Sequence, residues 1–283
     1  MTLIKDYYSL TKPGIIYGNS VTVLGGYFLG SQTHFHFLSF LLTFVGMALI
    51  IACGCVLNNY IDRDIDRLMK RTKNRPSVRG VISVRNAMIY AAILGIAGVC
   101  ILGLLVNLLT LLIALFGLFV YVVLYSLWFK RRSQFGTAVG AISGAIPPVV
   151  GYCAATNSFD MGAVILFLIL YFWQMPHFFA ITIFRIKDYS VAKIPVLSVN
   201  KGIYHTKIRM LAYIVPFTIA AAMPAVFGYA GLLYLIVALG IGVAWFCLGV
   251  RGFAAQSDVI WSRKMFMFSV MNIMVLCLMM SVT

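Results

Sequence analysis

The sequence predicts an all-α membrane protein in which a bundle of nine helices crosses the bilayer. Two observations support this prediction. First, 62% of the 283 residues are hydrophobic and 10% are charged, a composition typical of a polytopic membrane protein and not of a soluble domain. Second, the charged residues gather in short segments and leave long uncharged stretches between them. A single transmembrane domain over residues 1–283 is therefore expected.

The uncharged stretches give the expected helices in order. They cover residues 13–61, 86–129, 133–184, 210–250 and 265–283, and Asp160 is the only charged residue inside them. Because a helix needs about 20 residues to cross the hydrocarbon core, each of the first four stretches holds two spans and the last holds one. The expected spans are 14–32, 37–59, 86–106, 108–128, 135–155, 161–184, 210–229, 231–250 and 265–283.

The distribution of basic residues predicts the orientation of these spans. All 22 Lys and Arg fall on one side of the bundle, and the opposite connections, around residues 31–36, 107, 156–160 and 228–231, carry none. The positive-inside rule makes the basic side, with the amino terminus, cytoplasmic. The net charge of +15 thus describes a membrane surface and not nucleic-acid binding. Removing one hairpin, such as 86–128, would keep this sidedness, so seven spans remain an alternative to nine.

Two spans contain patterns that predict local structure. Gly136, Gly140 and Gly144 have the small-xxx-small spacing of closely packed membrane helices, and the following Pro147-Pro148 pair is expected to break the same span near its middle. In the span before it, Tyr121 and Tyr125 lie one turn apart near the inner end. They are expected to belong to an interfacial aromatic belt, with a position facing an internal cavity as the alternative.

A cluster of oxygen-bearing side chains follows the second span. Asn58, Asp62 and Asp66 are spaced four residues apart, which places them on one face of a helix, while Asp64 falls on the opposite face. Hard oxygen ligands suit Mg²⁺, which proteins usually hold through one or two carboxylates together with substrate phosphates. The spacing therefore predicts a site for a divalent cation bound to a polyphosphate.

A run of basic residues comes directly after this cluster and could hold the remaining phosphate oxygens. It consists of Arg67, Lys70, Arg71, Lys73, Arg75 and Arg79. The alternative is an ordinary helix end at the membrane edge, with solvated charges and local Asp–Arg pairs.

The sequence has two long polar loops, residues 60–85 and residues 185–209. Each of them follows an even-numbered span. This suggests a diverged duplication in which each half contributes to one site. Asp188 is the only carboxylate of the second loop, and it is the expected partner of the first cluster. The alternative is a surface salt bridge between Asp188 and Lys187 or Arg185, which would stabilise little.

Several motifs in order along the chain carry a family resemblance. They are Thr11–Ile16, Asn58–Asp66, Arg71–Arg75 before Pro76, Tyr125–Ser126 with Lys130–Arg131, Gly144–Pro148, Trp173–His177, and Lys187–Tyr189 with Ile194–Val196. In these motifs, across residues 11 to about 202, the chain resembles the UbiA-type intramembrane prenyltransferases and, within them, the bacterial haem farnesyltransferases.

The resemblance implies a nine-helix bundle with a cavity open to the membrane and an active site at the cytoplasmic rim. The farnesyl group of farnesyl diphosphate would be transferred to haem B, with Mg²⁺ as cofactor. The expected metal ligands are Asn58, Asp62, Asp66 and Asp188. The expected diphosphate ligands are Arg71, Arg75, Lys130, Lys187 and Lys12, and Lys187 is also expected to take part in catalysis.

The chain departs from the wider superfamily at both acidic motifs. The first motif of that superfamily usually has Asp directly after the Asn, where this chain has Asn59. The second usually carries paired carboxylates, whereas Phe184 and Ala192 stand four residues either side of Asp188. With fewer acids, the site is expected to bind fewer Mg²⁺ ions and to rely more on Lys and Arg for its positive charge.

His177 is the candidate for haem recognition. It lies about seven residues from the inner end of span 161–184, and ionisable residues inside spans are functional more often than not. We expect it to ligate the haem iron. The alternative is a histidine that is hydrogen-bonded within the bundle near Trp173 and Gln174.

Two other functions remain open from the sequence. A related enzyme could prenylate an aromatic quinone precursor, since only the acceptor differs. A transporter or Mg²⁺ channel would also place acids beside basic loops, but transporters place ionisable residues near the bilayer midplane, and here they cluster at one rim. The expected location is the bacterial inner membrane, with a terminal oxidase or another haem-modifying enzyme as a possible partner.

Overall fold

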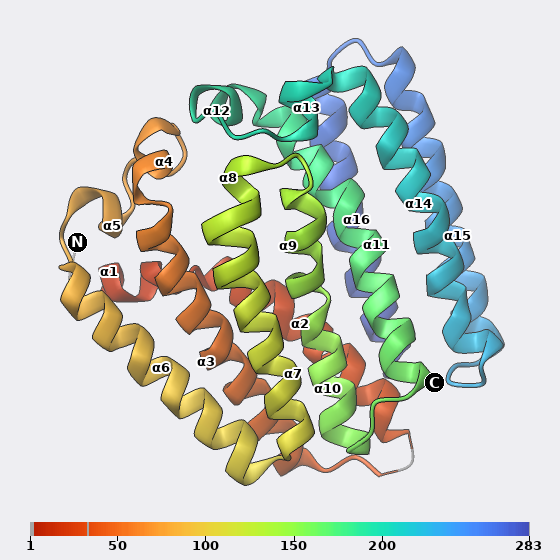
Figure 1. Cartoon of the computed structure of the whole chain (residues 1–283). Coiled ribbons are helices and arrows are strands. Elements are labelled where there is room, and N and C mark those ends of the chain that lie inside the picture. The colour runs from red at the N-terminus through yellow and green to blue at the C-terminus, as the bar shows by residue number, and fades with distance from the viewer. Residues whose placement is uncertain (1–2, 33, 283) are drawn as a thin grey trace.

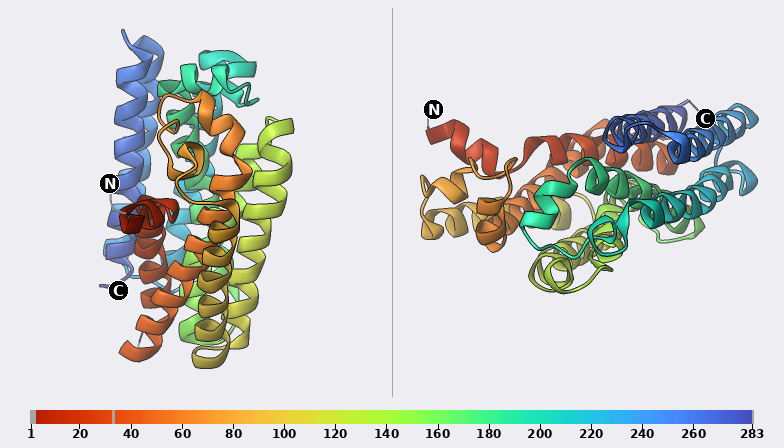
Figure 2. Two further views of the ribbon diagram at one scale, coloured as in Figure 1. Left: turned by 90° about the vertical axis from the view of Figure 1, so that its left-hand side faces the viewer. Right: turned by 90° about the horizontal axis from the view of Figure 1, so that it is seen from above.

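The computed structural model describes residues 3–32 and 34–282. All regular secondary structure in these two ranges is helical, which confirms the predicted fold class. Figure 1 shows the helices as a bundle of roughly parallel and antiparallel elements, and Figure 2 shows the same bundle from its left-hand side and from above.

Eight helices of the described residues are long and apolar enough to cross a membrane. They are α3 (Phe37–Ile61), α6 (Val84–Leu105), α7 to α8 (Leu108–Arg132), α9 and α10 (Gly136–Thr156), α11 (Met161–Phe184), α14 (Gly202–Val226), α15 with η2 (Leu232–Ala254) and α16 (Asp258–Met279). The helix expected over 14–32 is α2 (Pro13–Ser31). It contains Asn19, Ser20 and five glycines and is not among the eight, so the number of nine spans remains a prediction.

Two predicted helix starts were wrong. Helix α14 begins at Gly202 and not near 210, and α16 begins at Asp258 and not at 265. The uncharged stretches begin after Arg209 and Lys264, but both helices extend past these charges, which are exposed. The buried Lys207 is neutralised by Asp258, with Nζ 2.5 Å from Oδ1, and also donates to the Gly252 carbonyl at 2.6 Å. A paired charge can lie inside a helix where an isolated charge would be costly.

Close backbone contacts hold α2 against α10 (Ile146–Thr156). A Cβ atom on Gly26 would lie 1.9 Å from the Pro148 carbonyl oxygen, and one on Gly151 would lie 2.1 Å from the Val23 carbonyl oxygen. A side chain at either glycine would therefore force the two helices apart. The break predicted at the proline pair is confirmed, because α9 (Gly136–Gly144) ends and α10 begins on either side of Ala145.

The predicted close packing of the glycine series is also confirmed. A Cβ atom on Gly144 would lie 2.0 Å from Gln174 Oε1. One on Gly140 would lie 3.1 Å from the Tyr125 ring, and one on Gly136 would lie 3.1 Å from the Lys130 backbone. The glycines thus bring α9 against both α11 and the segment before it.

That preceding segment is not a regular α-helix throughout. After α7 (Leu108–Phe119), the residues of η1 (Val120–Phe129) form a π-helix, which continues into α8 (Lys130–Arg132). A π-helix shifts the side chains that follow it relative to an α-helix and often occurs at functional sites. Here it sets the direction of Ser126 and Lys130.

Short helices gather at one end of the bundle, at the top of Figure 1. From the first polar loop come α4 (Arg63–Leu68) and α5 (Pro76–Arg79), and from the second come α12 (Ile186–Val191) and α13 (Leu197–Asn200). The amino-terminal helix α1 (Leu3–Leu10) packs against α5 and the end of α3. The two predicted polar loops therefore lie at the same end.

Candidate active site

The first acidic motif crosses the junction of α3 and α4. Helix α3 ends at Ile61 and α4 begins at Arg63, so the predicted continuous helix is interrupted at Asp62. The four-residue spacing survives, because Asp62 N donates to Asn58 O at 2.9 Å and Asp66 N donates to Asp62 O at 2.8 Å. All three side chains are buried. Asp64 faces away from them, as predicted, and is exposed.

A chain of hydrogen bonds and ion pairs runs through Asn58. Its Oδ1 accepts from Lys12 Nζ, and its Nδ2 donates to Asp62 Oδ2 and to Ser126 Oγ, both at 2.8 Å. Lys130 Nζ donates to the same carboxylate oxygen. Because an ammonium group can only donate and a carboxylate can only accept, the orientation of the Asn58 amide is fixed. The result is a connected series Lys12–Asn58–Asp62–Lys130, in which Asn58 and Asp62 are buried and the two lysines are half-buried.

Lys12 reaches this site from a strained backbone position. It joins α1 to α2 with φ 53° and ψ 65°, in the left-handed region that non-glycine residues rarely adopt. Such conformations cluster at functional sites, where the surrounding structure enforces them. Burial lowers the pKa of Lys12 to about 8. Smaller electrostatic effects follow: Cys55 and Asp62 raise this pKa, and Arg75 and Lys130 lower it. The two other cations are therefore close to its ammonium group.

Asn59 explains why the end of α1 lies over the site. Its Nδ2 donates to the Leu10 carbonyl at 2.7 Å and to the Cys55 carbonyl at 3.0 Å, and its side chain is buried. An aspartate at this position could not donate either hydrogen bond. The missing acid of the first motif is thus replaced by an amide that ties α1 to α3 and so positions Lys12.

Asn59→Asp is expected to lower the free energy of unfolding by about 2–3 kcal/mol, because it removes two donors and places a charge beside two buried carbonyl groups. Thermal unfolding in detergent, followed by tryptophan fluorescence, measures the effect. Asn86→Asp is the matched control, since Asn86 is exposed in the first turn of α6, where an acid is favourable. Equal stability of both variants would contradict the role given to Asn59.

The basic run divides between three places. Arg75 Nη1 pairs with Asp66 Oδ2 at 2.5 Å, and the Asp66 carbonyl accepts from Thr72 Oγ1 at 2.9 Å. Arg79 instead pairs with the buried carboxylate of Asp6 on α1 at 2.5 Å, and Arg67 lines a separate surface pocket. These last two residues do not contact Asp62 or Asp66 in this arrangement, so their binding to the same phosphate stays a prediction.

The second loop contacts the first, while the duplication itself stays a hypothesis. Asp188 Oδ1 accepts from the backbone N–H of Lys70 at 3.1 Å. Beside this bond, a small apolar cluster joins the two loops; its buried members are Ile65, Met69, Ala192, Ile194 and Val196. A carboxylate at position 192 would be buried in this cluster, which accounts physically for the absence of a second acid there.

A cavity of about 50 Å³ lies beneath the second loop. Tyr125, Lys130, Phe178, Thr182 and Tyr189 are among its lining residues. The aromatic-belt interpretation of Tyr125 was therefore wrong: its ring faces this interior space, with Lys130 Nζ 5.7 Å from the ring centroid. Burial raises the pKa of the Tyr189 phenol; nearby Tyr125 and Asp188 raise it further, and Arg71 and Lys130 lower it.

Not every predicted residue joins the cluster. Arg71 and Lys187 are exposed. Lys187 on α12 has no ion pair with the buried carboxylates in the described part of the chain. Its catalytic role and its role in diphosphate binding therefore remain predictions.

His177 is held in an aromatic stack between two helices. Its ring centroid lies 4.6 Å from Trp173 and 4.8 Å from Phe266, and Nδ1 lies 2.7 Å from Ser269 Oγ. Since Ser269 Oγ already donates to the Phe266 carbonyl at 2.6 Å, it accepts from Nδ1–H. This hydrogen bond assigns the proton to Nδ1 and leaves the lone pair on Nε2, the atom that can ligate a metal.

The residues around Asp62 fit a magnesium ion that is shared with a phosphate ligand. In residues 3–32 and 34–282, no three His, Cys, Asp or Glu side chains form a metal-binding group by themselves, and Lys130 and Arg75 pair with the carboxylates of Asp62 and Asp66. Asp62 Oδ1 is nevertheless buried without a hydrogen-bond partner, and a buried carboxylate oxygen of this kind is a ligand that Mg²⁺ prefers.

Sequence reasoning missed the contributions of three residues. Ser126 fixes the Asn58 amide, Ser269 fixes the His177 tautomer, and Asn59 positions α1. Asn59 was visible as a departure from the superfamily pattern. The two serines gave no signal, since isolated serines inside apolar helices are ordinary in membrane proteins.

The chain matches a family profile and several known proteins. A profile described as the UbiA prenyltransferase family matches residues 19–272. A relative from Yersinia pseudotuberculosis serotype O:1b (strain IP 31758), named protoheme IX farnesyltransferase, is 50% identical over 280 residues, which cover 99% of this chain and 95% of the relative.

Two solved structures have the same fold. One, from work on the digeranylgeranylglyceryl phosphate synthase in membranes, has a TM-score of 0.80 at 22% identity and covers 100% of this chain and 98% of its own. The other, a UbiA homologue from Archaeoglobus fulgidus bound to GPP and Mg²⁺, has a TM-score of 0.70 at 13% identity and covers 98% and 100%. These likenesses establish the fold of the bundle.

Proposed function

Because the chain belongs to the UbiA prenyltransferase family, we propose that it transfers the farnesyl group of farnesyl diphosphate to haem B. The relative named protoheme IX farnesyltransferase, which matches 99% of the chain, supports this choice of acceptor. The observation that carries the proposal is the connected series Lys12–Asn58–Asp62–Lys130, whose amide and carboxylate are buried between two cations. It brings cations and hard oxygen ligands together where a diphosphate can bind.

Mg²⁺ would be held by Asp62 and Asp66, with Asn58 and Asp188 as further ligands. When bound, it stabilises the negative charge that grows on the leaving diphosphate. The Archaeoglobus structure, which contains GPP and Mg²⁺, supports this cofactor. This chain has fewer acids at its two acidic motifs than the wider superfamily. Its site would therefore depend strongly on basic side chains.

The basic side chains bind the diphosphate by exchanging partners. Lys130 and Arg75 neutralise Asp62 and Asp66 in the free protein, and Lys12 lies beside them. When the diphosphate enters, these three cations turn to its oxygens, and Arg71 and Lys187 approach from the exposed side. Preorganised charges of this kind stabilise the charge that develops in the transition state.

The reaction itself needs no protein nucleophile. The bond between C1 of the farnesyl group and the diphosphate oxygen breaks, and the bonding electrons leave with the diphosphate. The π electrons of a haem vinyl group then form the new carbon–carbon bond to C1. Water adds to the resulting cation beside the porphyrin ring and loses a proton, which gives the hydroxyethylfarnesyl group of haem O. The apolar bundle keeps water from the first cation.

His177→Ala is expected to weaken haem B binding by at least about tenfold, because a ligand to the iron would be lost. Titration of the purified protein with haem B, followed by the Soret absorbance, measures the affinity and the ligation state. His205→Ala is the matched control, since His205 is exposed on the same end of the bundle. An unchanged affinity and an unchanged Soret band would leave His177 with a packing role.

The activity is expected to fall as pH rises through about 8. Lys12, whose pKa burial lowers to about 8, carries its charge below that pH and loses it above, so the free enzyme loses one diphosphate-binding cation. The measurement is the pH profile of kcat/KM for farnesyl diphosphate. Lys12→Arg, which stays charged, should move the alkaline fall to higher pH. The same fall in this variant would assign it to another group.

The direct test of the activity is reconstitution of the purified protein with haem B, farnesyl diphosphate and Mg²⁺. Mass analysis of the extracted porphyrin should find a haem that has gained a farnesyl group and one hydroxyl group. Product with an aromatic quinone precursor but none with haem B would replace the proposed acceptor. Absence of both products would contradict a prenyltransferase.

The proposed location is the bacterial inner membrane, with the site on the cytoplasmic side. The relatives are bacterial, and the basic residues favour this orientation. Haem O is amphiphilic, so a terminal oxidase or another haem-modifying enzyme would take it up within the membrane. Residues 60–85 and 185–209 then form the active-site loops of a single domain over residues 1–283.

A further inference from the structure

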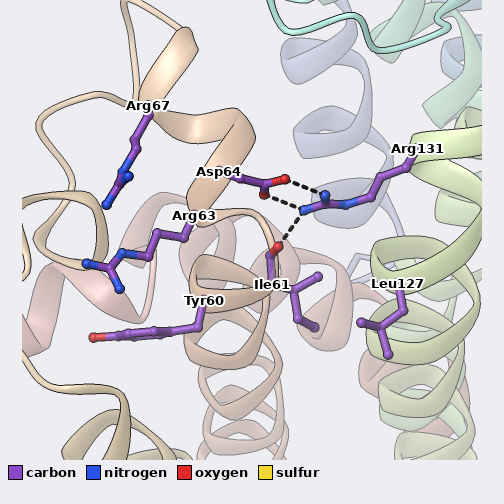
Figure 3. Close-up of a pocket in the computed structure, with 7 residues that line it drawn as sticks. All are labelled: Tyr60, Ile61, Arg63, Asp64, Arg67, Leu127 and Arg131. Carbon is purple, nitrogen blue, oxygen red and sulfur yellow. Dashed lines mark hydrogen bonds and ion pairs between the residues drawn. The ribbon is translucent and has the colours of Figure 1, made fainter.

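A second basic pocket lies on the outer surface of the bundle, where α3 and α4 meet η1. Its volume is about 540 Å³. The lining residues, drawn in Figure 3, are Tyr60, Ile61, Arg63, Asp64, Arg67, Leu127 and Arg131. None of them is among the residues that line the cavity beneath the second loop. The pocket therefore shares no lining residue with that cavity, although Arg131 also reaches Asp62.

The charges of this pocket are unbalanced. Arg131 is paired with Asp64 through two hydrogen bonds of 2.7 Å and also donates to the Ile61 carbonyl at 2.5 Å. Arg63 and Arg67 have no carboxylate within 4.0 Å in the part of the chain that the structure describes. Figure 3 shows the guanidinium groups of Arg63 and Arg67 on one side of α4 and the neutral Asp64–Arg131 pair on the other. The two unpaired arginines therefore give the pocket lining a net charge of about +2.

One of these arginines has an unmet hydrogen bond. The Nε atom of Arg63 is buried and has no hydrogen-bond partner among the described residues. A buried donor without an acceptor costs free energy, and buried donors are nearly always satisfied. An anionic oxygen in the pocket would supply the acceptor and the missing negative charge together, with the bidentate geometry that guanidinium groups offer to phosphate.

The surroundings of the pocket are apolar and lie at the end of the membrane-spanning helices. Leu127 in its wall is 53% exposed, and Leu68 and Trp128 beside it are 54% exposed. Figure 1 shows α6 and α7 joined at the bottom of the bundle and diverging upward, with the upper end of α3 between them. Basic residues above an apolar surface at this depth match the head group and chains of a lipid.

We propose that this pocket binds the phosphate group of an anionic membrane lipid, with Arg63 and Arg67 as its main ligands and the acyl chains along the exposed apolar residues at this end of the bundle. A free phosphate ion would satisfy the arginines but would leave the exposed apolar wall uncovered. The apolar wall therefore favours the lipid over the free ion. Arg131 connects the two sites, since its Nη2 also lies 3.7 Å from Asp62 Oδ1.

Native mass spectrometry tests the proposal with protein in mixed phosphatidylglycerol and phosphatidylcholine nanodiscs. The wild type should retain phosphatidylglycerol, and Arg63→Gln/Arg67→Gln should lose about thirtyfold in relative affinity, on a contribution of about fivefold for each basic residue beside an anionic membrane surface. Arg251→Gln/Arg263→Gln is the matched control: both arginines are exposed, and their helices α15 and α16 lie on the other side of the bundle from α3 and α4 in Figure 1. It should bind as the wild type does.

Two further measurements, a competition with inorganic phosphate and a single variant, distinguish the possible outcomes. Inorganic phosphate at millimolar concentration should not displace the lipid, and displacement would show a site for the free ion. Arg67→Gln alone, at an exposed position, should lose about fivefold even if the double variant is unstable. Retention of phosphatidylglycerol by both variants would overturn the proposal. The assay contains neither haem nor farnesyl diphosphate, so its failure would not bear on the proposed reaction.

Discussion

Asp62→Asn is expected to lower farnesyl transfer by at least about 10³-fold while the protein stays folded. Asp62 lies at the centre of the site and is 1% exposed. Its carboxylate accepts hydrogen bonds from Asn58 and Lys130, and its Oδ1 has no hydrogen-bond partner. Asparagine has nearly the same shape but loses the negative charge that a divalent cation needs. Removing electrostatic stabilisation of the leaving group at one position typically costs 10²–10³-fold or more in rate.

Asp64→Asn is the matched control for this variant. It removes a carboxylate two residues away, on the exposed face, where Arg131 lowers the Asp64 pKa to about 2 by hydrogen bonding. Its activity should stay within a few-fold of the wild type in the same reconstituted assay. Loss of activity in both variants would point to disruption of the α3–α4 junction, and full activity of Asp62→Asn would remove Asp62 from the site.

Lys130→Gln is expected to lower kcat by about 10²-fold, with a smaller effect on the KM for farnesyl diphosphate. The diphosphate gains negative charge as its bond to the farnesyl group breaks, so the lost cation matters more in the transition state than in the bound substrate. Glutamine keeps a donor for Asp62, which avoids leaving that buried carboxylate without any partner. Steady-state kinetics at saturating haem B separate the two parameters.

Lys130→Arg and Arg132→Gln complete this comparison. Arginine restores the charge at position 130 and should recover most of kcat, although it is not an exact replacement for a point charge. Arg132 is exposed two residues further along, and its substitution should leave kcat unchanged. An effect on KM alone in Lys130→Gln would show that Lys130 binds the substrate equally in ground and transition states.

Much of the fold could be predicted from where charges are absent. Uncharged stretches located α3, α6, α11 and α15 to within a few residues, because an unpaired charge is too costly inside the hydrocarbon core. The same reasoning failed at the starts of α14 and α16, where Lys207 and Asp258 pair with each other. Sequence separation hides such a pair, since its partners lie on different helices.

The acidic side of the candidate site was also accessible from the sequence. Four-residue spacing placed Asn58, Asp62 and Asp66 together and Asp64 apart, and the structure agrees even though the helix breaks at Asp62. The basic side was less accessible. Whether Arg67, Arg75 or Arg79 reaches the site depends on the path of the loop between α4 and α6, and no local periodicity determines that path.

Two features of the site arise from tertiary structure alone. The π-helix of η1 aims Ser126 at Asn58 and Lys130 at Asp62, and the apolar sequence of this segment gives no indication of it. Likewise, Lys12 enters the site because α1 docks on α3 through Asn59. Such arrangements depend on contacts between distant segments. These contacts offset the free-energy cost of the unusual backbone conformations.

The central claim is that a diphosphate opens the buried ion pairs and takes over their cations. The most direct measurement is an experimental structure of the protein with Mg²⁺ and a non-hydrolysable analogue of farnesyl diphosphate. The diphosphate should lie between residues 60–85 and 185–209, with Lys130 and Arg75 on its oxygens and with Asp62 and Asp66 on the metal. A structure in which the analogue binds elsewhere while the Lys130–Asp62 pair stays closed would contradict the claim.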